Sequence, residues 1–387
     1  MTARPVPLGS GATVWAPETV TDAPYNAETP AAALAEPLTP ADALFVREHF
    51  GVPRTDPAAW RLHLGGAVAH PLAIGHADLL ALPHRELDVL LECAGNGRTL
   101  MSPLPPGLPW GQRAVGCARF AGVPFATLAA RAGIDPRTVE IVFTGADSGT
   151  VHGRRTAFER SLPLAVALHP DTLLATRMNG EPLTPEHGAP VRLVVPGRYA
   201  VADVKWLAGA RAVTEPFTGV FQAEEYVYTA SRGTPEGPVT TLRVKSLITT
   251  PEPDTALRRG RQVLVTGRAW TGGGVPVRRV EVRAVPLEDA DAPPEPPEPP
   301  EPPEPPDATG PSRADGAAPW HEAVLDPPAG PYAWTGWTHR WTPERPGPYR
   351  LQSRATDSDG HTQPPHAPWN AHGYGCNPVA GVDVVVV

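Results

Sequence analysis

Cysteine is scarce in this sequence, with three residues among 387. Cys93, Cys117 and Cys376 lie far apart, and no two of them form a Cys-x-x-Cys pair. This argues against a disulfide framework and against the cysteine sets that hold structural zinc or iron–sulfur clusters. We therefore expect free thiols and a reducing compartment.

Other absences narrow the function further. The sequence has no block of basic residues and a formal net charge of -8, so we expect no nucleic-acid partner. No apolar run is long enough to span a bilayer, and the first residues lack the pattern of a signal peptide. We expect a soluble, cytoplasmic protein; secretion after removal of a signal is the alternative. An anionic substrate stays open, because a few arginines in one cleft reverse the local potential.

The first part of the chain, up to residue 230, mixes two periodicities. Short β-like runs alternate with Ala- and Leu-rich helical stretches, and loops rich in Gly and Pro separate them. The β-like runs lie at 89–91, 139–143 and 191–195, and the helical stretches at 124–132 and 162–168. This alternation predicts a mixed α+β domain over residues 1–230.

Beyond residue 230 the helical periodicity disappears. Turn signals such as a Gly-Gly-Gly run at 272–274 separate five β-like runs, at 242–248, 262–269, 279–285, 349–355 and 382–387. Short strands at this spacing predict an antiparallel β-sandwich over residues 231–387, with residues 232–238 as the connector.

Residues 293–306 of this second domain repeat Pro-Pro-Glu. The repeat cannot form ladder or helix hydrogen bonds, so it predicts an extended polyproline II segment. We interpret it as a surface loop between two strands, and a ligand for an SH3-like partner is the alternative.

Cys93 lies in the most informative segment of the first domain. Residues 88–98 read Asp-Val-Leu-Leu-Glu-Cys-Ala-Gly-Asn-Gly-Arg, which predicts a strand that ends in a tight loop. Arg98 would favour the thiolate of Cys93, the form that binds metals and attacks electrophiles. The alternative is a buried free cysteine beside a turn.

Cationic and donor side chains occur in two other segments. Arg47 and His49 are two residues apart on an extended stretch, so both side chains face the same way. His187, Arg192 and Lys205 follow later in the domain. Singly each is an ordinary surface charge, but as a set they suit phosphate and the polar edge of a heterocycle.

Nine short blocks occur along the chain in an order typical of one enzyme family. They are Phe-Val-Arg-Glu-His at 45–49, Cys-Ala-Gly-Asn-Gly-Arg at 93–98, Gly-Leu-Pro-Trp at 107–110, Gly-Ala-Asp-Ser at 145–148, Met-Asn-Gly-Glu-Pro-Leu at 178–183, His-Gly-Ala-Pro-Val-Arg at 187–192, Val-Lys-Trp-Leu at 204–207, Phe-Gln-Ala-Glu-Glu-Tyr at 221–226 and Trp-Asn-Ala-His-Gly-Tyr at 369–374. Over nearly its full length the chain resembles the sulfite oxidase family of molybdopterin enzymes, in the form without a haem domain. The resemblance implies a molybdopterin-binding α+β domain followed by an immunoglobulin-like β-sandwich for dimerisation, and hence a homodimer.

The resemblance also implies the roles of individual residues. Cys93 matches the one protein sulfur on molybdenum, where the pterin dithiolene supplies two more. The residues that match positions holding the pterin and its phosphate are Phe45, Arg47, His49, Asp147, His187, Arg192 and Lys205. Arg47 and Arg98 match arginines that line the oxyanion pocket. Trp110 matches a wall of that pocket, and Tyr226 a tyrosine whose hydroxyl lies near the metal.

The activity implied by the resemblance is the oxidation of sulfite, or a similar oxyanion, to sulfate by oxygen transfer at molybdenum. The sequence shows no haem-attachment motif, no iron–sulfur cysteine set and no dinucleotide fingerprint, so an external cytochrome or dioxygen would accept the electrons. Three alternatives stay open. They are a molybdopterin reductase of nitrate or a sulfoxide, a non-catalytic binding protein, and a hydrolase with Cys93 as nucleophile.

This chain departs from the family pattern at three places. Gly97 stands where many relatives have the first of two arginines, and Trp110 is slightly closer to Cys93 than in animal relatives. Relatives also bring an arginine from the β-domain to the anion pocket. The natural place for its counterpart is the region 334–337, but no arginine there aligns with it, and Arg340 is only nearby.

Overall fold

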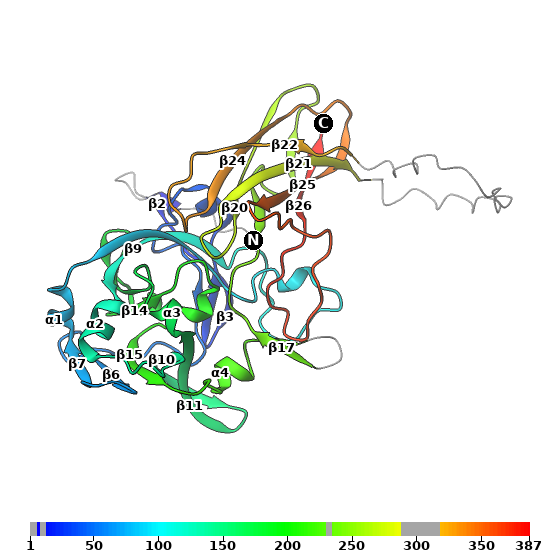
Figure 1. Cartoon of the computed structure of the whole chain (residues 1–387). Helices are drawn as coiled ribbons and strands as arrows, with labels where there is room; N and C mark the ends of the chain where they lie inside the picture. The colour runs from blue at the N-terminus through cyan, green and yellow to red at the C-terminus, as the bar shows by residue number, and fades with distance from the viewer. Residues whose placement is uncertain (1–5, 8–12, 230–233, 288–317) are drawn as a thin grey trace.

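Strands dominate the fold (Figure 1). The computed structural model describes residues 6–7, 13–229, 234–287 and 318–387. The α-helices in these ranges are short: α1 (His76–Leu80), α2 (Phe125–Ala132), α3 (Leu164–Ala167) and α4 (Val220–Ala223). In the described part of the chain, no helix is long and apolar enough to cross a membrane. The predicted polyproline II segment at 293–306 lies outside the described residues.

Both helices predicted from the sequence are present, as α2 and the shorter α3. Pro124 immediately precedes α2, and Gly133 ends it in the left-handed conformation, with φ +65°. The Ala-rich segment Ala31–Ala35 forms only a 3₁₀ turn, η1. The first part of the chain is therefore mostly β, and the expected mixed α+β class overstated its helix content.

Three sheets build most of the first part. A five-stranded sheet has the order β11 (Arg154–Pro163), β10 (Glu140–Val151), β15 (Leu207–Val213), β6 (Arg61–Gly66) and β7 (Leu72–Gly75). A second has the order β13 (Glu181–Pro182), β12 (Leu173–Met178), β9 (Val115–Pro124) and β8 (Arg85–Glu92), with β14 (Arg192–Val194) paired to β12. The third joins β3 (Glu18–Asp22), β4 (Tyr25–Glu28) and β5 (Val46–Arg47). A short ribbon pairs β1 (Val6–Pro7) with β2 (Thr13–Val14).

Two further sheets form the second part, and all five predicted β-runs belong to them. One has the order β18 (Lys245–Thr250), β20 (Val263–Trp270), β24 (Thr335–Trp341) and β23 (Val324–Leu325). The other has the order β19 (Thr255–Leu257), β26 (Ala380–Val386), β25 (Gly347–Asp357), β21 (Val277–Pro286) and β22 (His321–Glu322). One apolar cluster, which includes Val265, Trp337 and Leu351, draws on both sheets.

The two parts of the chain also share apolar surface. Trp270 and Trp334 come from the second part, yet both belong to the main core cluster of the first. Trp334 donates its indole N–H to the carbonyl of Pro37, 2.8 Å away. The segment predicted as a connector contains a short strand, β17 (Pro235–Pro238), which pairs with β16 (Val227–Thr229). The junction is therefore packed and hydrogen-bonded.

Candidate active site

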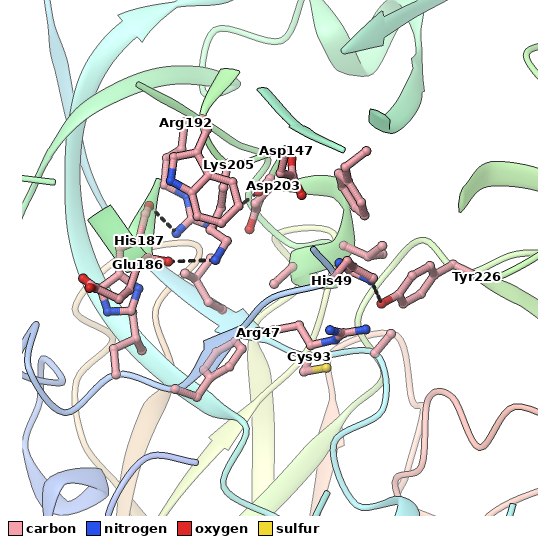
Figure 2. Close-up of a pocket in the computed structure, with 18 residues that line it drawn as sticks. Arg47, His49, Cys93, Asp147, Glu186, His187, Arg192, Asp203, Lys205 and Tyr226 are labelled. Carbon is pink, nitrogen blue, oxygen red and sulfur yellow. Dashed lines mark hydrogen bonds between the residues drawn. The ribbon is translucent and has the colours of Figure 1, made fainter. Parts of the chain in front are cut away.

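A cavity opens in the first part of the chain (Figure 2). Concave sites with a partly apolar lining and a few convergent polar groups are where small molecules and cofactors bind. The predicted site residues that line it are Phe45, Arg47, His49, Cys93, Asp147, His187, Arg192, Lys205 and Tyr226. The fold thus brings together side chains from segments that are far apart in the sequence.

One side of the cavity carries the thiol of Cys93. Cys93 directly follows β8, and Arg47 lies at the end of β5 beside it (Figure 2). Arg47 donates to the carboxamide oxygen of Asn26, 3.2 Å away, and to the carbonyl of Glu48. These two bonds fix the guanidinium at the cavity wall, where it presents a positive charge next to the sulfur.

The environment of Cys93 has opposing effects on its ionisation. Burial raises the pKa of the thiol, while Arg47, the backbone N–H of Gly95 and then Arg98 act to lower it. Arg98 thus acts in the predicted direction, but Arg47 contributes more and burial outweighs both. In the protein alone the thiol keeps its proton, which a bound metal would displace.

His49 and Tyr226 form a neutral hydrogen-bonded pair on the same side. The imidazole Nε2 lies 2.7 Å from the phenol oxygen. Burial lowers the pKa of His49 well below its ordinary value, and the charges of Arg47 and Lys205 lower it further. Burial raises the pKa of Tyr226. At neutral pH the pair therefore offers hydrogen bonds without adding charge.

The opposite side of the cavity is cationic. Arg192 begins β14 and donates to the carbonyl of His187, 3.2 Å away, while Lys205 donates to the carbonyl of Glu186, 2.7 Å away. Burial lowers the pKa of Lys205, and the charge of Arg192 lowers it further. Gly188 has φ +100°, and a Cβ there would lie 3.0 Å from the Cβ of Lys205, so glycine permits this close approach.

Buried acids complete the lining. Burial raises the pKa of Asp147 to about 6 and that of Asp203 to about 7. Asp147 lies where the pairing of β10 with β11 shifts register between Thr144 and Ser148, an irregularity that redirects side chains beside active sites. Sequence reasoning missed Asp203. Its spacing of two residues from Lys205 was the available signal, because alternate residues of an extended chain face the same way.

Arg98 and Trp110 are buried outside this lining. Arg98 donates to the carbonyls of His372 and Leu108, at 3.0 and 2.7 Å, and lies over the ring of Tyr374. The guanidinium thus supports the Cys93 loop from behind. The assignment of Arg98 and Trp110 to an anion pocket stays a prediction.

A segment of the second part, residues 370–376, reaches the same region. Gly375 donates its backbone N–H to the carbonyl of Ala94, 2.9 Å away, and the ring of Tyr374 stacks on Tyr226 with centroids 5.0 Å apart. In the described part of the chain, no arginine from beyond residue 230 lines the cavity, and Arg340 instead donates to Gln262. The β-domain arginine of the relatives therefore has no counterpart among the described residues that line this cavity.

At Gly97 the loop after Cys93 departs from the family pattern, and the structure gives a reason for a glycine there. It adopts φ +90°, and a Cβ there would lie 3.3 Å from the carbonyl oxygen of Cys376. We expect Gly97→Ala to lower the free energy of unfolding by at least about 1–2 kcal/mol, the cost of a left-handed L-residue. Gly153→Ala is the matched control, because Gly153 has φ +74° with nothing within 4 Å. If urea unfolding shows the same loss of free energy of unfolding for Gly97→Ala and Gly153→Ala, the contact with Cys376 does not add to the destabilisation.

His187 provides a pH test of the cationic side. Burial, with Arg192 and Lys205, lowers its pKa from 6.5 to about 3. In the unfolded chain the imidazole takes up a proton below pH 6.5, whereas in the folded protein it stays neutral until about pH 3. The free energy of unfolding is therefore highest above pH 6.5 and decreases as the pH falls from 6.5 toward 3. In cofactor-free protein we expect the wild type to lose about 2 kcal/mol more than His187→Gln between pH 7 and pH 5. Parallel urea-unfolding profiles for the two proteins would contradict this.

Comparisons with known proteins show similarity in both parts of the chain. Residues 49–221 match the family model of the oxidoreductase molybdopterin binding domain, and residues 237–285 match that of the Mo-co oxidoreductase dimerisation domain. The crystal structure of the sulfane dehydrogenase SoxCD from Paracoccus pantotrophus is similar, with a TM-score of 0.75 and 26% identity over 93% of this chain and 84% of that one.

Several sulfite oxidases are similar in sequence. The mitochondrial sulfite oxidase of Rattus norvegicus is 33% identical over 94% of this chain, which spans 64% of the length of that relative. The sulfite oxidase of Gallus gallus is 31% identical over 90% of this chain and 74% of its own length. The chain therefore belongs to the sulfite oxidase family of molybdopterin oxidoreductases.

Proposed function

We propose that this protein oxidises sulfite to sulfate at a molybdenum–molybdopterin cofactor and passes the electrons to an external acceptor. One observation carries the proposal. A single cavity places the thiol of Cys93 and the guanidinium of Arg47 on one side, and three cationic or donor side chains on the other (Figure 2). The names of the similar sulfite oxidases support sulfite as the substrate.

The residues present fit the cofactor. Four buried polar atoms in or beside the cavity have no hydrogen-bond partner among the described residues: Glu48 Oε1, Asp147 Oδ1, Arg192 Nε and Asp203 Oδ2. Such atoms suit the donors and acceptors of a pterin ring, since buried polar groups are normally paired. The soft sulfur of Cys93 suits a metal that is already held by sulfur.

We assign the binding roles accordingly. Cys93 would hold the metal, and Phe45, His49 and Asp147 would border the pterin. His187, Arg192 and Lys205 would hold the phosphate by charge-assisted hydrogen bonds. The bound phosphate would also restore the pKa of Lys205 toward its ordinary value, because an adjacent anion favours the charged ammonium.

When bound, the molybdenum supplies oxygen-atom transfer and stores two electrons. The protein's own contribution is to bind and orient the substrate. Arg47 is a fixed cation at the sulfur side, so it attracts a dianion without having to reorganise. The neutral pair of Tyr226 and His49 can donate a hydrogen bond to a substrate oxygen and leave the local charge unchanged. Sulfate is also a dianion, so its release requires a moderate attraction.

The assembly is also part of the proposal. We assign residues 1–230 to the catalytic domain and residues 231–387 to an immunoglobulin-like sandwich that forms a homodimer. The match of residues 237–285 to a dimerisation domain supports this division, as does the core shared by the two sheets of the second part. Light scattering of the purified protein tests the dimer.

A cytoplasmic location stays a prediction; the three cysteines are free in the structure, which agrees with a reducing compartment.

The decisive experiment combines cofactor analysis with two assays. Protein from a host that makes molybdopterin should contain molybdenum and pterin in equal amounts and should reduce ferricyanide when sulfite is added. Reduction of nitrate or a sulfoxide by reduced viologen, without sulfite-dependent ferricyanide reduction, would instead favour a reductase. A protein free of both metal and pterin would favour a binding protein.

A further inference from the structure

Glu92, the residue before Cys93, is buried with a fully bonded carboxylate. Its exposure is 1%, and it lines no part of the cavity. Oε1 accepts hydrogen bonds from Lys245 Nζ and Asn96 Nδ2, both at 2.9 Å, and Oε2 accepts one from Trp270 Nε1 at 2.8 Å. The negative charge next to the thiol is thus held by three donors, one of them cationic.

Two of the three donors come from the second part of the chain. Lys245 is the first residue of β18 and Trp270 the last of β20, and the two are direct partners in the sheet ladder. Lys245 is 4% exposed and pairs with Glu92 across 153 positions of sequence. One end of the second part's sheet therefore presents both donors to a single carboxylate behind the Cys93 loop.

Lys245 also bonds the loop itself. Its ammonium lies 3.3 Å from the carbonyl oxygen of Asn96. The Asn96 side chain accepts from the backbone N–H of Ala114, whose carbonyl in turn accepts from the N–H of Cys93. The Asn96 N–H donates back to the Cys93 carbonyl, 2.9 Å away. A single ammonium thus holds both ends of the turn that presents the sulfur.

We propose that Lys245 is a positioning residue for the Cys93 sulfur, and that through it the second part of the chain fixes the geometry of the metal ligand. Without Lys245, Glu92 would be a buried charge with no counter-charge, and such a charge is strongly destabilising. The Glu92 side chain and the turn would then rearrange to reach water. The importance of this for catalysis rests on the proposed function, but the positioning itself does not.

The test is hydrogen exchange of the cofactor-free full chain, resolved to the loop at 93–98. Lys245→Met should speed exchange there by about tenfold or more, because it opens the loop locally. Arg268→Met is the matched control. Arg268, in β20, is likewise a cation that bonds across the junction, but it donates to the carbonyls of Leu34 and Ala35. Arg268→Met should speed hydrogen exchange near residues 34–36 and leave hydrogen exchange in the loop at 93–98 unchanged.

A second variant keeps the test decisive. The double variant Glu92→Gln/Lys245→Met removes both charges of the buried pair. Hydrogen exchange of the loop at 93–98 should then return to within about threefold of the wild-type rate, because no unpaired charge stays buried. If Lys245→Met alone does not fold, recovery of folded protein by Glu92→Gln is the expected result. Equal loop exchange in Lys245→Met and Arg268→Met, or no recovery in the double variant, would overturn the proposal.

A readout from the loaded protein separates positioning from general stability. At equal molybdenum content per chain, Lys245→Met should change the electron paramagnetic resonance spectrum of partly reduced protein, and Arg268→Met should not. Failure of the proposed function would appear differently, as wild-type protein that binds no metal or does not oxidise sulfite while loop exchange still responds to Lys245.

Discussion

Cys93→Ser is expected to abolish sulfite oxidation while the protein stays folded. Serine has nearly the same size and occupies the same strand end, but its oxygen is a hard, weakly acidic ligand in place of a soft thiolate. We expect kcat to fall more than ~100-fold, since loss of a group that merely supports a metal ligand already costs roughly 10–100-fold. Steady-state reduction of ferricyanide by sulfite measures the effect, with kcat expressed per bound molybdenum.

Cys117→Ser is the matched control for this variant. Cys117 is also a buried free thiol, but it lies in the main core cluster and outside the cavity lining. It should keep activity close to that of the wild type. If Cys93→Ser kept full sulfite activity, the assignment of Cys93 to the metal would be wrong.

Arg47→Met is expected to lower kcat/KM for sulfite by about 100-fold, the equivalent of about 2.7 kcal/mol for one partner of a buried charge contact. Most of the loss should appear in KM, because Arg47 attracts the dianion before the chemical step. Arg137→Met is the control, since Arg137 is 81% exposed and pairs with Asp135 in the α2–β10 loop. It should leave both kinetic constants unchanged.

The dependence of the kinetic constants on ionic strength tests the electrostatic role of Arg47 in a second way. In the wild type, added salt should raise KM more than it lowers kcat, because salt screens the attraction between the cation and the approaching anion. The slope of this dependence should be shallower in Arg47→Met. A flat salt profile for the wild type would contradict an electrostatic role for Arg47.

The sequence named eleven candidate site residues from short blocks with recognisable chemistry, and nine of them line the cavity. Such blocks specify local backbone, for example the turn after Cys93. They do not specify which side chains from elsewhere surround it. Arg98 illustrates the limit: its position five residues after Cys93 suggested a place beside the thiol, but its donors bond to the carbonyls of Leu108 and His372.

The contacts that cross the junction could not be predicted from local patterns. The pair Lys245–Glu92 joins two residues that look like ordinary strand charges, and nothing in their neighbours marks them as buried. The helix content was overstated for a related reason. Ala-rich segments have helical propensity, but tertiary packing and flanking prolines decided how much of it was realised. The β-runs were predicted well because alternation along a strand directly reflects burial.

The contact of Arg98 with His372 joins residues 274 positions apart in the chain. The ribosome therefore synthesises the turn at 93–98 long before the segment 370–376 that packs against it. The nascent turn lacks the bond from Gly375 to Ala94 until translation is nearly finished. The contacts that support the turn from the second part of the chain are therefore complete only when the last residues have been made.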